Sequence, residues 1–160
     1  AEAVVRSARY APDGGRSGGP VMVGMRHADN RAWAADTIAV IPMIETAEAI
    51  SNLDEILSVP GIDAIYVGPA DLGVSLGLEP SGNDGTPVFD DALATIVDAC
   101  RRHGIVPGIH ATGALTPLRR EQGFRMITVT SDGLALRVGY ASELSAARET
   151  AGPARSDTLY

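Results

Sequence analysis

Two acidic residues, Glu45 and Asp71, end short apolar runs and are the side chains of this sequence with the clearest potential for chemistry. The runs, at 38–44 and 62–67, are rich in β-branched residues and predict strands of a parallel sheet. Ligands and catalytic groups gather at the carboxyl ends of such strands. Two carboxylates that converge there offer oxygen ligands to a hard divalent cation. The sequence therefore predicts a metal site formed by Glu45 and Asp71.

The turn that leads to Asp71 adds a second feature. In Gly68-Pro69-Ala70-Asp71, glycine allows close backbone approach, and the N–H groups of Ala70 and Asp71 point outward at a helix start. Such a turn suits a carboxylate ligand. An anion-binding turn beside metal-binding acids is the pattern of a site for a 2-oxo acid, whose oxygens chelate the metal. Taken singly, Glu45 and Asp71 also suit a helix cap or a solvated surface.

The segments that must position these residues alternate between strand-like and helix-like patterns. Residues 1–9 resemble the tail of a helix, and residues 10–36 are expected to form a long functional loop with a short helix near 21–25. Strands are then predicted at 38–44, 62–67, 105–110 and 125–130, and helices at 47–58, 88–102, 114–122 and 133–150. Four βα units with continuous apolar strands predict an α/β fold whose parallel sheet is buried on both faces, with the helices outside. Four such units are half of an eight-stranded barrel.

Composition narrows the classes of function. The 160 residues suffice for one domain, and a net charge of −7 argues against nucleic acid or an anionic membrane as partner, since both attract basic surfaces. The thirteen basic residues are all arginine, so a Schiff-base mechanism, which needs a lysine, is excluded for these residues. No signal segment opens the chain and no apolar run reaches roughly 18 residues, so a cytoplasmic location is expected. Cys100 is expected to be buried, and Arg119 and Arg120 are expected on a solvated helix face.

Several motifs together resemble one family. They are Met43-Ile44-Glu45-Thr46, Pro60-Gly61-Ile62-Asp63, Tyr66-Val67-Gly68-Pro69-Ala70-Asp71-Leu72 and Leu76-Gly77. These segments resemble the HpcH/HpaI aldolases, the metal-dependent class II pyruvate aldolases of the phosphoenolpyruvate/pyruvate barrel superfamily. The 26-residue separation of the two acids (71 − 45) fits that family's ligand spacing. The resemblance implies a (β/α)₈ TIM barrel, with residues 1–150 as its C-terminal half, strands five to eight. Residues 151–160 are expected to form a disordered tail.

The resemblance also implies roles for individual residues. Glu45 and Asp71 would bind Mg²⁺, Mn²⁺ or Co²⁺, the amides of Ala70 and Asp71 would hold the pyruvate carboxylate, and the Gly19-Pro20 loop would flank the substrate. The family's catalytic base and oxyanion-stabilising arginine are expected upstream of this chain, so its catalytic residues are unknown. Weaker candidates for substrate contact are Met43, which replaces the glutamine of some members, Arg16 and His110.

The implied reaction is the cleavage of 4-hydroxy-2-oxo acids to pyruvate and an aldehyde through a metal-bound enolate. The implied partners are therefore a small 2-oxo acid and an aldehyde, and the full-length family members assemble as homo-oligomers that exchange the last helix. Two alternatives stay open. One is a citrate-lyase-β-like CoA lyase of the same superfamily; the other is a catalytically incomplete fragment that only binds metal and a 2-oxo acid.

Overall fold

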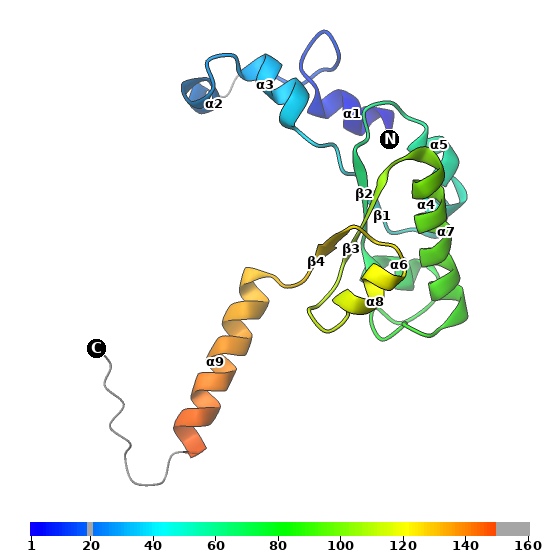
Figure 1. The fold of residues 1–160 in the computed structure, drawn as a ribbon, viewed down its shortest axis with the longest axis vertical. Coiled ribbons are helices and arrows are strands. Elements are labelled where there is room, and N and C mark those ends of the chain that lie inside the picture. Colours follow the sequence, from blue (N-terminus) through cyan, green and yellow to red (C-terminus); the bar gives the residue numbers. More distant parts are fainter. Residues whose placement is uncertain (19–20, 150–160) are drawn as a thin grey trace.

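A parallel four-stranded sheet forms the centre of the protein in a computed structural model that describes residues 1–18 and 21–149 (Figure 1). The strands are β1 (Met43–Ile44), β2 (Ala64–Val67), β3 (Val106–His110) and β4 (Met126–Thr128), and they follow one another across the sheet in sequence order. All three strand pairs are parallel. The α/β class and the parallel sheet predicted from the sequence are confirmed. The predicted tail at 151–160 lies outside the described residues.

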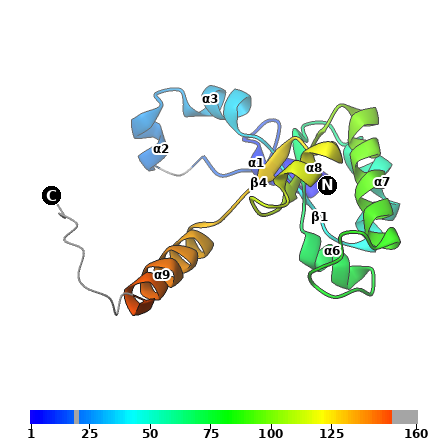
Figure 2. The ribbon, with the colours of Figure 1, turned by 60° about the horizontal axis from the view of Figure 1, so that its bottom comes forward.

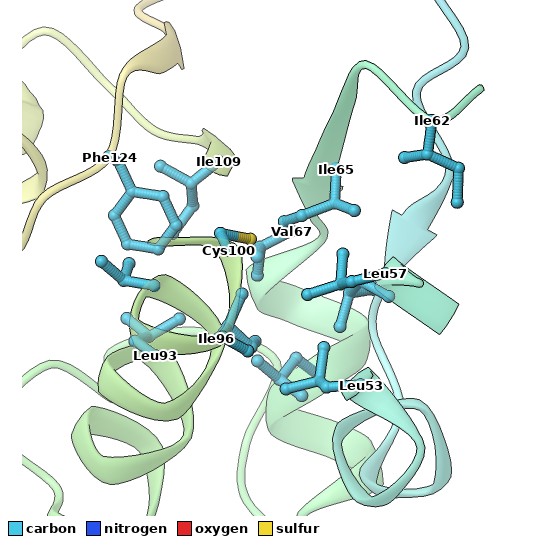
Figure 3. Close-up of a cluster of buried hydrophobic side chains, with 14 of the residues drawn as sticks. Leu53, Leu57, Ile62, Ile65, Val67, Leu93, Ile96, Cys100, Ile109 and Phe124 are labelled. Atoms are coloured by element: carbon cyan, nitrogen blue, oxygen red, sulfur yellow. The ribbon is translucent and has the colours of Figure 1, made fainter. Parts of the chain in front are cut away.

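Three helices cover one face of the sheet: α4 (Ala47–Ser51), α5 (Leu53–Leu57) and α7 (Pro87–His103) (Figure 1). The core lies between them and the strands, where Ile65, Val67 and Ile109 are fully buried against apolar side chains of α5 and α7 (Figure 3). Cys100 is also fully buried there, as expected, and burial raises the pKa of its thiol to about 11.

The opposite face of the sheet is less covered than predicted. Alternate residues of the strands point to it, and among them Met43 is 52% exposed and Val106 is 41% exposed. Burial on both faces therefore does not hold within the described chain. The helices α4, α5 and α7 thus pack on the same face of the sheet. Helices lie in this way on the outside of a (β/α)₈ barrel, whose interior is filled by side chains from all of its strands.

Local sequence explains where the helices begin and end. Thr46 accepts a hydrogen bond from the amide of Ala49 (3.0 Å) and starts α4, and Gly104 ends α7 in the left-handed conformation (φ 69°). The helix predicted over 47–58 is interrupted at Asn52, which separates α4 from α5. The first strand is also shorter than the predicted 38–44, because only Met43 and Ile44 pair regularly with β2.

The N-terminal segment holds one more helix than the sequence suggested. Helices α1 (Glu2–Ala8) and α2 (Val21–Arg26) agree with the helix expected at 1–9 and the short helix expected near 21–25, whereas α3 (Asn30–Thr37) was not expected. Asp29 caps α3 by accepting a hydrogen bond from the amide of Ala32 (3.3 Å). Arg9 joins the end of α1 to α3: it donates to the carbonyls of Ala35 and Ile38 (2.9 and 3.1 Å).

The last helix, α9 (Asp132–Glu149), extends from β4 away from the sheet (Figures 1 and 2). Its exposed apolar side chains are Leu136, Val138, Tyr140 and Leu144. Among residues 1–18 and 21–149, no helix has both the length and the apolar character needed to cross a bilayer.

Candidate active site

The carboxyl ends of the four strands form one row of residues. Val67 pairs with Ile44 on one side and with Ile109 on the other, so the next step of the register brings Glu45, Gly68 and His110 to the same level. His110 in turn pairs with Thr128. Alternation along a strand sends these side chains to the face opposite Ile65 and Val67, away from the helical layer. The row is thus directed toward the uncovered face of the sheet.

Glu45 lies directly against Gly68. A β-carbon built on Gly68 would stand 2.7 Å from Oε2 of Glu45, closer than real β-carbons approach any atom. Glycine at position 68 therefore leaves the space that the carboxylate fills. Because Glu45 is half-buried, its charge needs compensation from a cation or from hydrogen-bond donors.

Asp71 lies in the first turn of α6 (Pro69–Ser75), which Gly68 caps. The first backbone bond of this helix runs from the amide of Leu72 to the carbonyl of Gly68 (2.9 Å), so the amides of Ala70 and Asp71 precede the intrahelical pattern. Ala70 and Asp71 are both exposed. Glu45 thus follows β1 and Asp71 follows β2, its neighbour in the sheet. Gly68 lies against Glu45 and caps the helix that contains Asp71.

A cavity of about 410 Å³ opens beside this turn. Of the residues predicted to contact substrate, Met43, Ala70, Asp71 and His110 line it. Glu45 is not among its lining residues and lies behind Gly68. The volume is within the range of small-molecule pockets.

Arg16, another predicted substrate contact, lies elsewhere. The guanidinium of Arg16 stacks over the ring of Tyr10, 5.0 Å from its centroid, and Arg16 does not line the cavity. Gly19 and Pro20 lie outside the described residues. The assignments of these three residues to substrate binding stay predictions.

Three polar side chains form a hydrogen-bonded chain across the uncovered face of the sheet, the one opposite the helices. The phenol of Tyr66 on β2 donates to Oγ1 of Thr128 at the end of β4 (2.6 Å), and its oxygen lies 3.2 Å from Nδ1 of His110 on β3. Tyr66 and His110 line the cavity. The sequence drew attention to His110 alone, because Tyr66 and Thr128 become neighbours only through strand pairing.

An ion pair between a buried arginine and a more exposed aspartate lines another side of the cavity. Arg119, on α8 (Thr116–Glu121), has a side chain that is 3% exposed and lies 2.7 Å from the carboxylate of Asp84. It also donates to Oε1 of Gln122 (2.9 Å). The expectation that Arg119 is solvated is wrong, whereas Arg120 is exposed as predicted. One signal was available: Arg119 follows Leu115 by four residues and therefore shares its helix face.

The donor set fits a hard cation with a largely aqueous shell. Among residues 1–18 and 21–149, no group of three or more His, Cys, Asp or Glu side chains is arranged to hold a metal ion. Mg²⁺ is held in proteins by one or two carboxylates and keeps several waters. The carboxylates of Glu45 and Asp71 are oxygen donors of that kind.

Comparison with known proteins finds aldolases among the relatives of this chain. The chain is 34% identical to the hydroxypyruvate/pyruvate aldolase of Rhizorhabdus wittichii over 134 residues, which are 82% of this chain and 53% of that protein. It is 32% identical to the 4-hydroxy-2-oxo-heptane-1,7-dioate aldolase of Shigella flexneri, over 93% of this chain and 60% of the relative. The chain thus spans little more than half the length of the curated relatives it matches.

Comparison with solved structures gives a relative that is also described as an aldolase/citrate lyase. A crystal structure of an HpcH/HpaI aldolase/citrate lyase family protein from Burkholderia cenocepacia superposes with a TM-score of 0.77 at 32% identity, covering 91% of this chain and 59% of that one. The family model for HpcH/HpaI aldolase/citrate lyase matches residues 1–137, which include the Glu45 and Asp71 strand ends and the Gly68 turn. The chain belongs to the HpcH/HpaI aldolase/citrate lyase family.

Proposed function

We propose that this chain is part of a divalent-metal-dependent aldolase that cleaves 4-hydroxy-2-oxo acids to pyruvate and an aldehyde. One observation carries the proposal: the Glu45 carboxylate lies against Gly68, at the start of the helix whose first turn holds Asp71. In this proposal the two acids, which follow neighbouring strands, bind one cation. The names of the relatives support the reaction class, since both are aldolases.

Each residue of the site has a role in this proposal. Glu45 and Asp71 hold Mg²⁺, Mn²⁺ or Co²⁺, which when bound supplies Lewis-acid stabilisation of the enolate charge. The amides of Ala70 and Asp71, at the start of α6, hold the carboxylate of the 2-oxo acid. Met43 and His110, which line the same cavity, contact the rest of the substrate in this proposal.

The same proposal extends to the architecture of the whole protein. A (β/α)₈ barrel in which this chain supplies strands five to eight is supported by the helices on one face of the sheet and the partly exposed opposite face. The base and the oxyanion-stabilising arginine then come from the other half of the barrel. Assembly into a homo-oligomer is supported by the exposed apolar side chains of α9, among them Val138 and Leu144.

The test measures metal-dependent release of pyruvate by the complete gene product that contains this chain. Substituting Asp71→Asn removes one ligand charge with little change of size, and we expect pyruvate release to fall by at least a hundredfold. The matched control is Asp91→Asn, an exposed acid on α7 that does not line the cavity, which should leave the rate unchanged. Undiminished release by the Asp71 variant contradicts the proposed role. Stabilisation by metal and pyruvate without turnover favours a protein that only binds these ligands.

A further inference from the structure

A loop between α6 and α7 forms one wall of the cavity. This wall loop, residues 79–86, lies between the end of α6 at Ser75 and the start of α7 at Pro87. Its residues 80–84 line the cavity. Loops are usually more mobile than the elements they connect, unless bonds attach them to those elements. The position of this wall therefore depends on the contacts that the wall loop makes.

Two contacts attach the wall loop to the helices before and after it in sequence. Nδ2 of Asn83 donates to the carbonyl of Glu79 (2.6 Å) and fills the space beside Gly73 of α6, where a β-carbon would stand 2.5 Å from it. The amide of Gly85 donates to the carboxylate of Asp90 in the first turn of α7 (3.1 Å). Both contacts are local, because each joins the loop to a neighbouring helix.

The ion pair between Asp84 and Arg119 attaches the wall loop to a distant part of the chain. Arg119 lies on α8, which follows β3, and its Nη1 is 2.7 Å from Oδ1 of Asp84. Within residues 1–18 and 21–149, Nε of Arg119 has no hydrogen-bond partner, so Asp84 and Gln122 are the groups that hold this buried charge. Moving Asp84 away would leave the guanidinium unpaired in a buried place, which is costly. The pair therefore keeps the wall loop against α8.

The groups proposed for the pyruvate half of the substrate lie on other elements. The metal ligands are Glu45 and Asp71, and the amides proposed for the carboxylate belong to the first turn of α6. None of these groups comes from the wall loop or from α8. The half of the substrate that leaves as the aldehyde then occupies the rest of the cavity, which the wall loop lines together with Phe89 and Leu115.

We propose that Arg119 is a positioning residue for the aldehyde: through Asp84 it holds the wall loop in place against the aldehyde half of the substrate. A wall that is held in place before binding loses less freedom when the ligand arrives. The ion pair therefore lowers the KM for the aldehyde and has no part in enolate formation. The proposal rests on the proposed aldolase function and adds a residue that acts on its second substrate.

The kinetic test uses Arg119→Met in the complete metal-loaded gene product. Methionine fills the buried space without a charge, and Asp84, whose side chain is 30% exposed, is then hydrated, so the variant should fold. We expect at least a fivefold rise in the KM for acetaldehyde, and a smaller rise in Asp84→Asn, whose amide oxygen still accepts from Arg119. The matched control is Arg120→Met, an exposed arginine of the same helix that does not line the cavity.

Two further measurements separate a positioning role from a loss of structure. Exchange of the pyruvate methyl protons with deuterated water reports enolate formation alone, and it should change less than twofold in Arg119→Met. Amide hydrogen exchange reports the loop itself: the amides of Gly85 and Thr86, which donate to Asp90 and to the carbonyl of Asn83, should exchange at least fivefold faster in Arg119→Met than in Arg120→Met.

Each outcome of these measurements supports or overturns the proposal. A raised KM for acetaldehyde with unchanged methyl exchange and a less protected wall loop supports it. An unchanged KM, an unchanged wall loop, or equal losses in aldehyde addition and methyl exchange overturn it while the aldolase function stands. Absence of methyl exchange in the wild type contradicts the aldolase function, and the role of Arg119 in aldehyde binding with it.

Discussion

Replacing Gly68 with alanine tests whether the space beside Glu45 matters for the metal site. The backbone at Gly68 has φ −92° and ψ 93°, a conformation that alanine adopts without strain. The new methyl group would stand 2.7 Å from Oε2 of Glu45 and 3.1 Å from Cε of Met43. Methionine is flexible and can move, but the carboxylate must leave its present position. The substitution therefore acts on Glu45 while keeping its charge.

The size of the effect follows from losing one of two carboxylate ligands. Displacing a group that orients a metal ligand typically weakens metal binding by about 10- to 100-fold. This corresponds to roughly 1.4–2.8 kcal/mol of binding free energy. Stability should change little or rise slightly, because alanine in an allowed conformation reduces the freedom of the unfolded chain by about 0.4–1 kcal/mol.

Isothermal titration with Mn²⁺, together with urea denaturation, separates the two effects. The matched control is Gly113→Ala, in the loop after β3, where a β-carbon meets no atom within 4 Å. We expect weaker metal binding in Gly68→Ala alone, with both variants folded. Wild-type affinity in a folded Gly68→Ala protein would refute the reasoning, since Glu45 could then be displaced at no cost to the site.

Two further predictions concern stability. Asp84→Ala removes the ion-pair partner of the buried Arg119 and should lower the free energy of unfolding by roughly 3 kcal/mol in urea denaturation. The control Asp98→Ala breaks an exposed pair with Arg101 and should have little effect. Similar losses in the two variants would contradict the account. Burial raises the pKa of the Cys100 thiol from 9.0 to about 11, so the thiol ionises at lower pH in the unfolded chain than in the folded one. The free energy of unfolding should therefore fall between about pH 9 and 11, and it should fall less in Cys100→Val. An equal fall in the wild type and in the variant would exclude the thiol as its cause.

The sequence predicted the parts of the fold that depend on local pattern. Strand β2 with the Gly68 turn and helix α7 with Cys100 on its buried face were both expected from apolar periodicity and turn residues. Helix α3 was missed, because only Ala34 is buried on it and no apolar stripe marks it. Its signal was the Asp29 cap, inside a segment whose glycines and prolines favoured a loop.

The candidate site, like the fold, has residues that the local sequence pattern predicted and residues that it did not. Asp71 and His110 could be found because Asp71 follows the turn after a predicted strand and His110 ends one, and both line the cavity. The links of His110 to Tyr66 and Thr128 depend on the register of β2, β3 and β4, which no local pattern reveals. Arg119 was misjudged because a charged residue on a short helix is usually exposed, and its partner Asp84 is 35 residues away (119 − 84).

The central claim is that Glu45 and Asp71 bind the same divalent ion, and a double-mutant cycle on Mn²⁺ affinity tests it most directly. The variants are Glu45→Gln, Asp71→Asn and the pair together, each measured by isothermal titration. The account predicts one Mn²⁺ per wild-type chain, at least a tenfold weaker affinity in each single variant, and a double variant clearly different from the sum of the two. Two single variants with wild-type affinity, or strictly additive losses, would contradict a shared ion.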